Sequence, residues 1–143
     1  MPPGLLPELG PAPVPWAADE SLADPAEATL LLDQRTAAAV VLKLPVLGGL
    51  LPARDLALRA QERGLGVVVT HFFDGPIGLA AAAELARSLP APPLACGLDP
   101  HPQLSAWPPV SIPQLAHRGA VCASQSPGLG LVLPPPEERP WMA

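Results

Sequence analysis

Side chains that could take part in metal or acid-base chemistry stand directly after short apolar runs of this sequence. Asp19 and Glu20 follow the first run, Lys43 follows the second, and a polar segment that contains Thr70, His71, Asp74 and Gly75 follows the third. Carboxylate oxygens are the ligands that Mg²⁺ prefers. A lysine next to apolar residues either has a lowered pKa or directs its charge at an anion. These residue types suit the binding of a divalent cation and of a small carboxylate substrate.

Each of these residues also has a purely structural interpretation. Lys43 lies within the apolar stretch 37–45, where an unpaired ammonium ion would cost several kcal/mol, so its side chain could instead reach out to solvent or pair with an acid on a helix. Asp19 could cap the turn that follows it. His71 could bind a substrate carboxylate or make ordinary hydrogen bonds within its loop.

The elements that must position these residues follow from the apolar periodicity. Strands are predicted at 14–18, 39–42, 66–69 and 94–98, and helices between them. One helix begins at Pro25 behind the N-cap Asp24, a second spans 52–63 and stops at Gly64, and a third opens at 74–76 and ends before Pro90. This alternation predicts an α/β fold with a parallel sheet. Because parallel strands end at one edge, the candidate residues should lie close together.

The length predicts only part of a barrel. With 143 residues the chain falls short of the ~250 residues of a complete (β/α)₈ barrel. Residues 1–100 supply four βα units of a partial barrel, and the proline-rich residues 101–143 form a loop-rich tail. Four strands cannot close a barrel and would leave open sheet edges. We therefore expect a missing first half of the barrel, supplied by another segment or by a separate chain.

Composition excludes several classes of function. The net charge is −5, without a basic stripe that could neutralise phosphates, so nucleic acid is not an expected partner. The most apolar stretch, 37–53, is interrupted by Lys43, Pro45 and two glycines, so no membrane helix is expected. The N-terminus lacks the positive region of a secretory signal, which predicts a cytoplasmic protein. The two cysteines predict neither a disulfide framework nor a zinc site.

Four segments carry a resemblance to a known family. They are 17–22 (Ala-Ala-Asp-Glu-Ser-Leu), 41–49 (Val-Leu-Lys-Leu-Pro-Val-Leu-Gly-Gly), 69–79 and 126–130 (Ser-Pro-Gly-Leu-Gly). In order and spacing they resemble the last half of the enolase superfamily barrel, in its muconate-cycloisomerase branch, and most of all the o-succinylbenzoate synthases. The resemblance covers about residues 5 to 133.

The resemblance implies a reaction and a role for each site residue. Asp19 would be the third acidic ligand of an essential Mg²⁺, with Glu20 as a supporting ligand. Lys43 would be the catalytic lysine of the sixth strand, and Thr70, His71, Asp74 and Gly75 would belong to the substrate loop of the seventh. A proton alpha to a carboxylate is removed, an enediolate is stabilised, and loss of water yields o-succinylbenzoate for menaquinone. Such a carbon acid ionises only beside a cation and a base of tuned pKa.

Two departures keep other functions open. The segment 70–76 is not the serine-rich stretch expected for the substrate loop, and the Lys-x-Lys motif, the first two metal carboxylates and the capping domain of the family are absent from this sequence. An N-acylamino acid racemase or a dipeptide epimerase of the same superfamily is one alternative. A remnant or interaction module without catalysis is the other.

Overall fold

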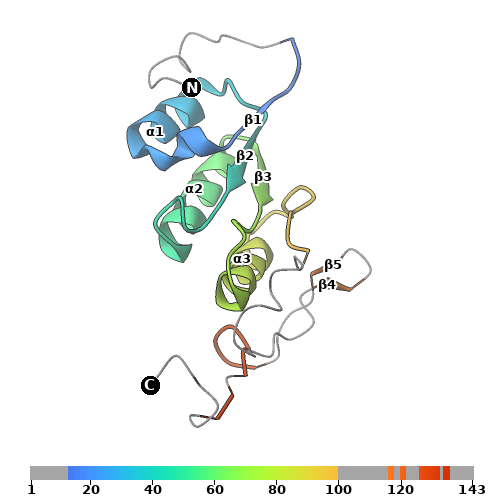
Figure 1. Ribbon diagram of the computed structural model, residues 1–143. Coiled ribbons are helices and arrows are strands. Elements are labelled where there is room, and N and C mark those ends of the chain that lie inside the picture. The colour runs from blue at the N-terminus through green and yellow to red at the C-terminus, as the bar shows by residue number, and fades with distance from the viewer. Residues whose placement is uncertain (1–12, 100–115, 118–119, 122–125, 133, 136–143) are drawn as a thin grey trace.

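The computed structural model describes residues 13–99, 116–117, 120–121, 126–132 and 134–135. Three βα units make up most of the described part (Figure 1). Strand β1 (Ala17–Ala18) leads through a short 3₁₀ helix η2 (Glu20–Ala23) into α1 (Pro25–Gln34); β2 (Ala39–Leu42) is followed by α2 (Leu50–Glu62), and β3 (Gly66–Val69) by α3 (Pro76–Ser88). Strands β4 (Ala116–His117) and β5 (Ala120–Val121) form a separate antiparallel pair.

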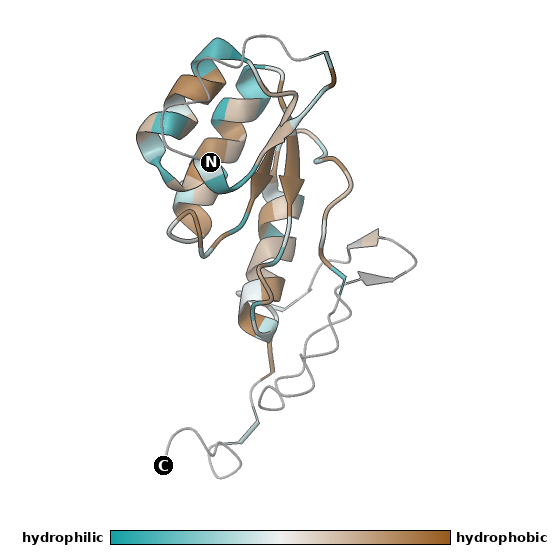
Figure 2. Ribbon diagram, turned by 45° about the horizontal axis from the view of Figure 1, so that its top comes forward, coloured by the Kyte–Doolittle hydropathy of each residue, from teal (hydrophilic) through white to brown (hydrophobic). Residues whose placement is uncertain are grey.

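The three strands form a parallel sheet in the order β1-β2-β3. In its register Ala18 lies opposite Val40, and Val40 lies opposite Val67. Helices α2 and α3 pack against the sheet, and Figures 1 and 2 show the helices gathered on one side of it. A parallel sheet whose strands alternate with helices is the predicted α/β fold, a part of a (β/α)₈ barrel.

The core lies between this face of the sheet and the helices. Side chains alternate between the two faces of a strand, and Val40, Leu42, Val67 and Val69 are fully or almost fully buried on the helix side. Alanines of α2 and α3 meet them; Ala53, Ala57 and Ala60 in α2 have no exposed surface. Small side chains let the helices approach the strands closely, which explains how a core with few aromatic residues is filled.

The local signals that predicted the helices are seen in the structure. Asp24 caps α1, because its Oδ1 accepts hydrogen bonds from the backbone N–H groups of Ala26 at 2.8 Å and Glu27 at 3.4 Å. Helix α2 ends one residue earlier than predicted, at Glu62, and Gly64 follows in the left-handed region with φ +77°. The predicted start of α1 at Pro25 is confirmed, and the predicted bounds of α2 agree with the structure to within two residues.

The strands at the two edges are shorter than predicted. Of the first run only Ala17 and Ala18 pair as a strand. The fourth run forms a single parallel bridge, between Gly97 and Thr70, although the N–H of Leu94 also donates to the Val67 carbonyl at 2.7 Å. The fourth run thus bonds to β3 at its two ends, through Leu94 and Gly97, without forming a continuous strand.

Two further observations complete the fold. The predicted turn 126–130 is present, with Gly128 and Gly130 in left-handed conformations, and Leu129 packs against the hydrophobic core. Cys96 is a free, partly buried thiol, whereas Cys122 lies outside the described residues. No helix among the described residues has the length and apolar character needed to cross a membrane.

Candidate active site

The candidate site lies where the parallel strands end. Strand β1 stops at Ala18 because the Asp19 carbonyl accepts the N–H of Leu22 at 2.9 Å and starts η2. Strand β2 stops at Leu42 because the next carbonyl, that of Lys43, accepts the N–H groups of Val46 and Leu47 and forms a turn. This turn continues into α2 through two glycines with positive φ. Both strand ends therefore present their last side chains at the same edge.

The alternation along the strands places these side chains on the face without helices. Val40 and Leu42 point toward the helices, so Val41 and Lys43 point the opposite way. By the same count along β3, Thr70 shares this face with Lys43. The inner face of a barrel is therefore the face that carries the candidate residues.

Lys43 joins the two predicted acids. Its Nζ lies 2.7 Å from Asp19 Oδ2 and 2.8 Å from Glu20 Oε1, and it donates a hydrogen bond to each. The Lys43 side chain is 14 % exposed, against 32 % for Asp19 and 77 % for Glu20. The prediction that these three residues meet at neighbouring strand ends is borne out by this contact.

The charges of this cluster shift two pKa values. Hydrogen bonds to Asp19 and then Glu20 raise the pKa of Lys43 above its ordinary 10.5, against the opposing effect of burial. The hydrogen bond from Lys43 lowers the pKa of Glu20 below its ordinary 4.5. Of the two expectations for Lys43, a pKa lowered by burial is therefore wrong in this form of the chain, since the paired carboxylates outweigh desolvation.

The cluster has part of what a magnesium site needs. Two carboxylates hold one cation, the ammonium ion, between them, which shows that their oxygens converge on a position suited to positive charge. Magnesium requires about six oxygens, and within the described residues no group of three or more His, Cys, Asp or Glu side chains could hold a metal ion. Asp19 and Glu20 fit as two ligands, and the remaining ligands must come from elsewhere.

The predicted substrate loop lies next to Lys43. The Thr70 hydroxyl donates to the Gly97 carbonyl at 3.1 Å, and a Cβ at Gly97 would come within 2.5 Å of Thr70 Oγ1. His71 Nδ1 accepts the N–H of Phe73, and Asp74 Oδ2 accepts the N–H of Phe72. These contacts organise the loop, and Gly75 is the N-cap of α3. Their role toward substrate remains a prediction.

One residue of the site was missed in the sequence. The ring of Phe72 lies 5.5 Å from Lys43 Nζ, a cation–π contact that connects the third strand end to the second. Its position depends on the loop conformation, in which Phe73 adopts a φ of +53°. Nothing in the residue order alone predicts which of two neighbouring phenylalanines turns toward the lysine.

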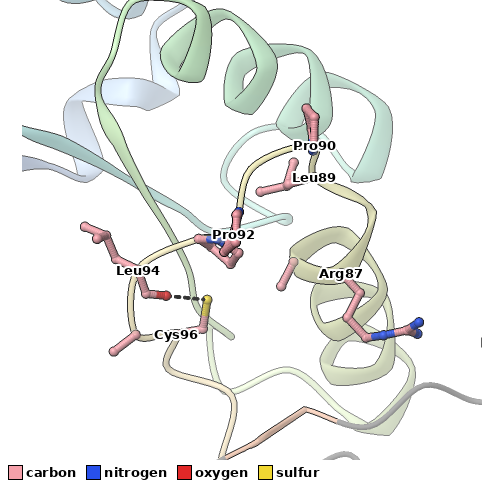
Figure 3. Close-up of a pocket in the computed structure, with 9 residues that line it drawn as sticks. Arg87, Leu89, Pro90, Pro92, Leu94 and Cys96 are labelled. Atoms are coloured by element: carbon pink, nitrogen blue, oxygen red, sulfur yellow. Dashed lines mark hydrogen bonds between the residues drawn. The ribbon is translucent and has the colours of Figure 1, made fainter.

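A cavity lies away from this cluster. It has a volume of about 460 Å³ and is bordered by the end of α3 and the segment leading to Cys96 (Figure 3). The Cys96 thiol donates to the Leu94 carbonyl at 3.2 Å, and Arg87 pairs with Glu84. This cavity lies where the fourth strand begins, the end of a barrel where side chains serve stability rather than chemistry.

The comparisons agree with this geometry. The family model described as enolase C-terminal domain-like matches residues 6–137. The chain is 45 % identical over 85 residues to the o-succinylbenzoate synthase of Thermobifida fusca, covering 59 % of this chain and 26 % of that protein. It is 36 % identical over 85 residues to the o-succinylbenzoate synthase of Mycobacterium bovis, with 59 % and 25 % covered. The chain thus spans about a quarter of the length of these relatives.

Solved structures show the same fold. The N-succinyl Arg/Lys racemase of Bacillus cereus superposes with a TM-score of 0.71 at 21 % identity, over 86 % of this chain and 32 % of that one. The L-Ala-D/L-Glu epimerase of Bacillus subtilis gives a TM-score of 0.56 at 28 % identity, over 62 % and 24 %. A match that extends over most of the sequence, together with these neighbours, identifies the chain as a member of the enolase C-terminal domain-like family.

Proposed function

We propose that this chain supplies the Asp19–Glu20–Lys43 part of the active site of a Mg²⁺-dependent lyase that forms o-succinylbenzoate. The contact of Lys43 with Asp19 and Glu20 at two neighbouring strand ends carries this proposal. Its support in sequence is the similarity to o-succinylbenzoate synthases, one of them 45 % identical over 85 residues. The product would serve menaquinone synthesis in the cytoplasm.

Charge explains why the site would need a divalent cation. Two carboxylates and one ammonium ion sum to −1, which repels a carboxylate substrate. Asp19 and Glu20 would be two of the ligands of Mg²⁺, which when bound supplies positive charge against the substrate carboxylate. The cluster would then carry +1 and attract the same group. The remaining ligands would come from the other half of the barrel.

Lys43 would act as a fixed positive charge. Hydrogen bonds to Asp19 and Glu20 raise the pKa of Lys43, which favours the ammonium form while these two carboxylates face the amine. In the reaction, a base from the complementary half takes the proton alpha to the carboxylate, and the electron pair of that C–H bond moves toward the carboxylate. The Lys43 ammonium offsets the negative charge that develops there. The base then gives this proton to the substrate hydroxyl, which leaves as water, and the electron pair held on the carboxylate moves back to form the carbon–carbon double bond.

A second candidate function shares these residues. Two solved structures that superpose on the chain are a racemase of N-succinyl Arg/Lys and an epimerase of L-Ala-D/L-Glu. A racemase or epimerase also removes a proton alpha to a carboxylate, and then returns one to the opposite face instead of releasing water. The lyase is favoured because the relatives in sequence are o-succinylbenzoate synthases.

The test is reconstitution with the missing half. The chain is co-expressed with a polypeptide that carries the first βα units and the capping domain of this family, and o-succinylbenzoate formation is measured. We expect activity with Mg²⁺, and its loss by Lys43→Ala with an unchanged circular dichroism spectrum. Arg63→Ala, which removes a cation paired with Asp33 on the helix side, is the matched control and should retain activity. Racemisation without dehydration would support the second candidate, and neither activity would favour a non-catalytic module.

A further inference from the structure

The Lys43 ammonium group has a third neighbour besides the two carboxylates. The Phe72 ring has its centroid 5.5 Å from Lys43 Nζ, within the distance at which an aromatic face attracts a cation. Phe72 follows β3, whereas Asp19 and Glu20 follow β1, and β2 lies between these two strands. Lys43 is therefore contacted from both neighbouring strand ends.

The ring differs from the carboxylates in what it can bind. Asp19 and Glu20 pair with Lys43 and are also the two residues that fit Mg²⁺, so a metal ion and the lysine draw on the same oxygens. A phenyl ring offers no oxygen to a hard cation, and its attraction for the ammonium group does not depend on the metal ligands. Phe72 is thus the contact of Lys43 that would be kept when Mg²⁺ binds the carboxylates.

The loop after β3 fixes the backbone of Phe72. The N–H of Phe72 donates to Asp74 Oδ2 at 3.0 Å. Asp74 lies against Gly78 of α3, where an added Cβ would come within 2.4 Å of Asp74 Cβ. Gly78 therefore leaves the space that the Asp74 side chain occupies. These contacts connect the first turn of α3 to the ring beside Lys43.

We propose that Phe72 is a positioning residue for Lys43, and that Asp74 acts on Lys43 through Phe72. The aromatic face holds the ammonium group at the strand ends, both when the carboxylates pair with it and when they bind Mg²⁺. The inference deepens the proposed function and rests on it only for the part that Lys43 plays in the reaction. The position of the lysine itself can be measured in the chain alone.

Lys43 is the only lysine of the sequence, which gives the test a single signal. The full chain is prepared with isotope-labelled lysine, and the NMR signal of the Lys43 ε-methylene protons is recorded with and without magnesium chloride. Protons above an aromatic face resonate upfield of their ordinary position, because the ring current opposes the applied field there. We expect an upfield signal in both solutions, and its loss in Phe72→Leu, which keeps an apolar side chain without a ring. Phe72→Tyr should keep the upfield signal, and so should Phe73→Ala, the matched control that removes the neighbouring ring.

The same signal tests Asp74. Asp74→Ala removes the acceptor of the Phe72 N–H and should reduce the upfield shift, whereas Asp74→Asn keeps a side-chain oxygen and should retain most of it. Backbone amide spectra show that the variants compared are folded. An ordinary Lys43 shift in the unaltered chain would overturn the proposal, as would an upfield shift that survives Phe72→Leu.

The reconstituted enzyme supplies a second readout. Phe72→Leu should lower kcat about twofold to fivefold, the range that a cation–π contact at an exposed site provides, and should leave KM unchanged, because the ring acts on the charge that develops during the reaction. Phe72→Tyr should restore kcat. A reconstituted enzyme without activity would refute the proposed function, while the lysine signal still decides whether Phe72 positions Lys43. An active enzyme whose kcat is the same in Phe72→Leu would refute the positioning role alone.

Discussion

Lys43 shows how strongly the partners of a lysine decide its behaviour. Its side chain is 14 % exposed, and burial by itself would lower its pKa. The hydrogen bonds to Asp19 and Glu20 outweigh that effect and raise the pKa instead. Asp19, Glu20 and Lys43 therefore form an ion-pair network at the strand ends.

The raised pKa predicts a pH-dependent stability. A lysine whose pKa is raised on folding stabilises the folded chain at pH values below 10.5, its ordinary pKa, and this contribution is lost as the pH rises through the folded value. Lys43→Met should lower the free energy of unfolding by about 0.5–1 kcal/mol at neutral pH, as for a largely solvent-screened pair. The deficit should shrink above pH 10.5. Urea titrations across this range measure it.

Arg63→Met provides the matched control for this measurement. It breaks the pair between Arg63 and Asp33, and arginine side chains stay charged over the whole range. The loss in free energy of unfolding caused by Arg63→Met should therefore stay constant in the pH range where the loss caused by Lys43→Met decreases. A Lys43→Met deficit that is the same at neutral and at strongly alkaline pH would contradict the ion pair as the source of the effect.

Near the start of α3, Gly78 lies in close contact with Asp74. A Cβ at Gly78 would lie 2.4 Å from Asp74 Cβ, and Asp74 holds the loop that carries Phe72. Gly78→Ala should therefore destabilise the chain by about 1–3 kcal/mol, although alanine in a helix normally gains up to about 1 kcal/mol over glycine. Thermal unfolding measures the difference. In an Asp74→Gly background the same substitution should cost less, and an equal cost would refute the contact.

The start of α1 depends on its cap. Asp24 Oδ1 accepts two backbone N–H groups of the first turn, which have no partner within the helix. Asp24→Ala should lower the free energy of unfolding by about 1 kcal/mol, and Asp24→Asn, which can accept the same hydrogen bonds, should lower it by less. Equal losses for both variants in urea titrations would show that the charge, and not the cap, matters at this position.

The sequence predicted those helix ends and strands whose positions depend on interactions between residues near one another in the chain. Asp24, Pro25 and Gly64 mark helix ends through their own hydrogen bonds and backbone preferences, so α1 and α2 could be located. The apolar runs at β2 and β3 are buried on the helix side and could be found for the same reason. The edge strands could not be delimited, because their length depends on neighbours outside the run.

The candidate site was predictable for a different reason. Parallel strands end at one edge, so Asp19, Glu20 and Lys43 had to come together once the topology was right. The direction of the Lys43 pKa shift was not predictable, since it depends on two hydrogen-bond distances. The contact of Phe72 with Lys43 was likewise not predictable, because no sequence pattern marks which way its ring points.

In the molecule as a whole, the hydrophobic core and the candidate site lie on opposite faces of one sheet. Helices cover one face and bury an entirely hydrophobic core there; among the described residues no buried side chain is polar or charged. The other face, which lines the interior in a complete barrel, carries Lys43 and Thr70 at its carboxyl end. The core and the candidate site are thus built from different sets of side chains.

This division predicts that the fold does not depend on metal. A divalent cation would bind Asp19 and Glu20 at the strand ends, where it replaces an ion pair that is already satisfied by Lys43, and it touches none of the core. The urea midpoint of the chain should therefore be the same in EDTA and in magnesium chloride, unlike that of domains whose metal supplies their folding energy. The reconstituted enzyme should lose activity in EDTA and regain it with magnesium. Unfolding of the chain in EDTA would mean that the cation holds the strand ends together, and that the two faces are not independent.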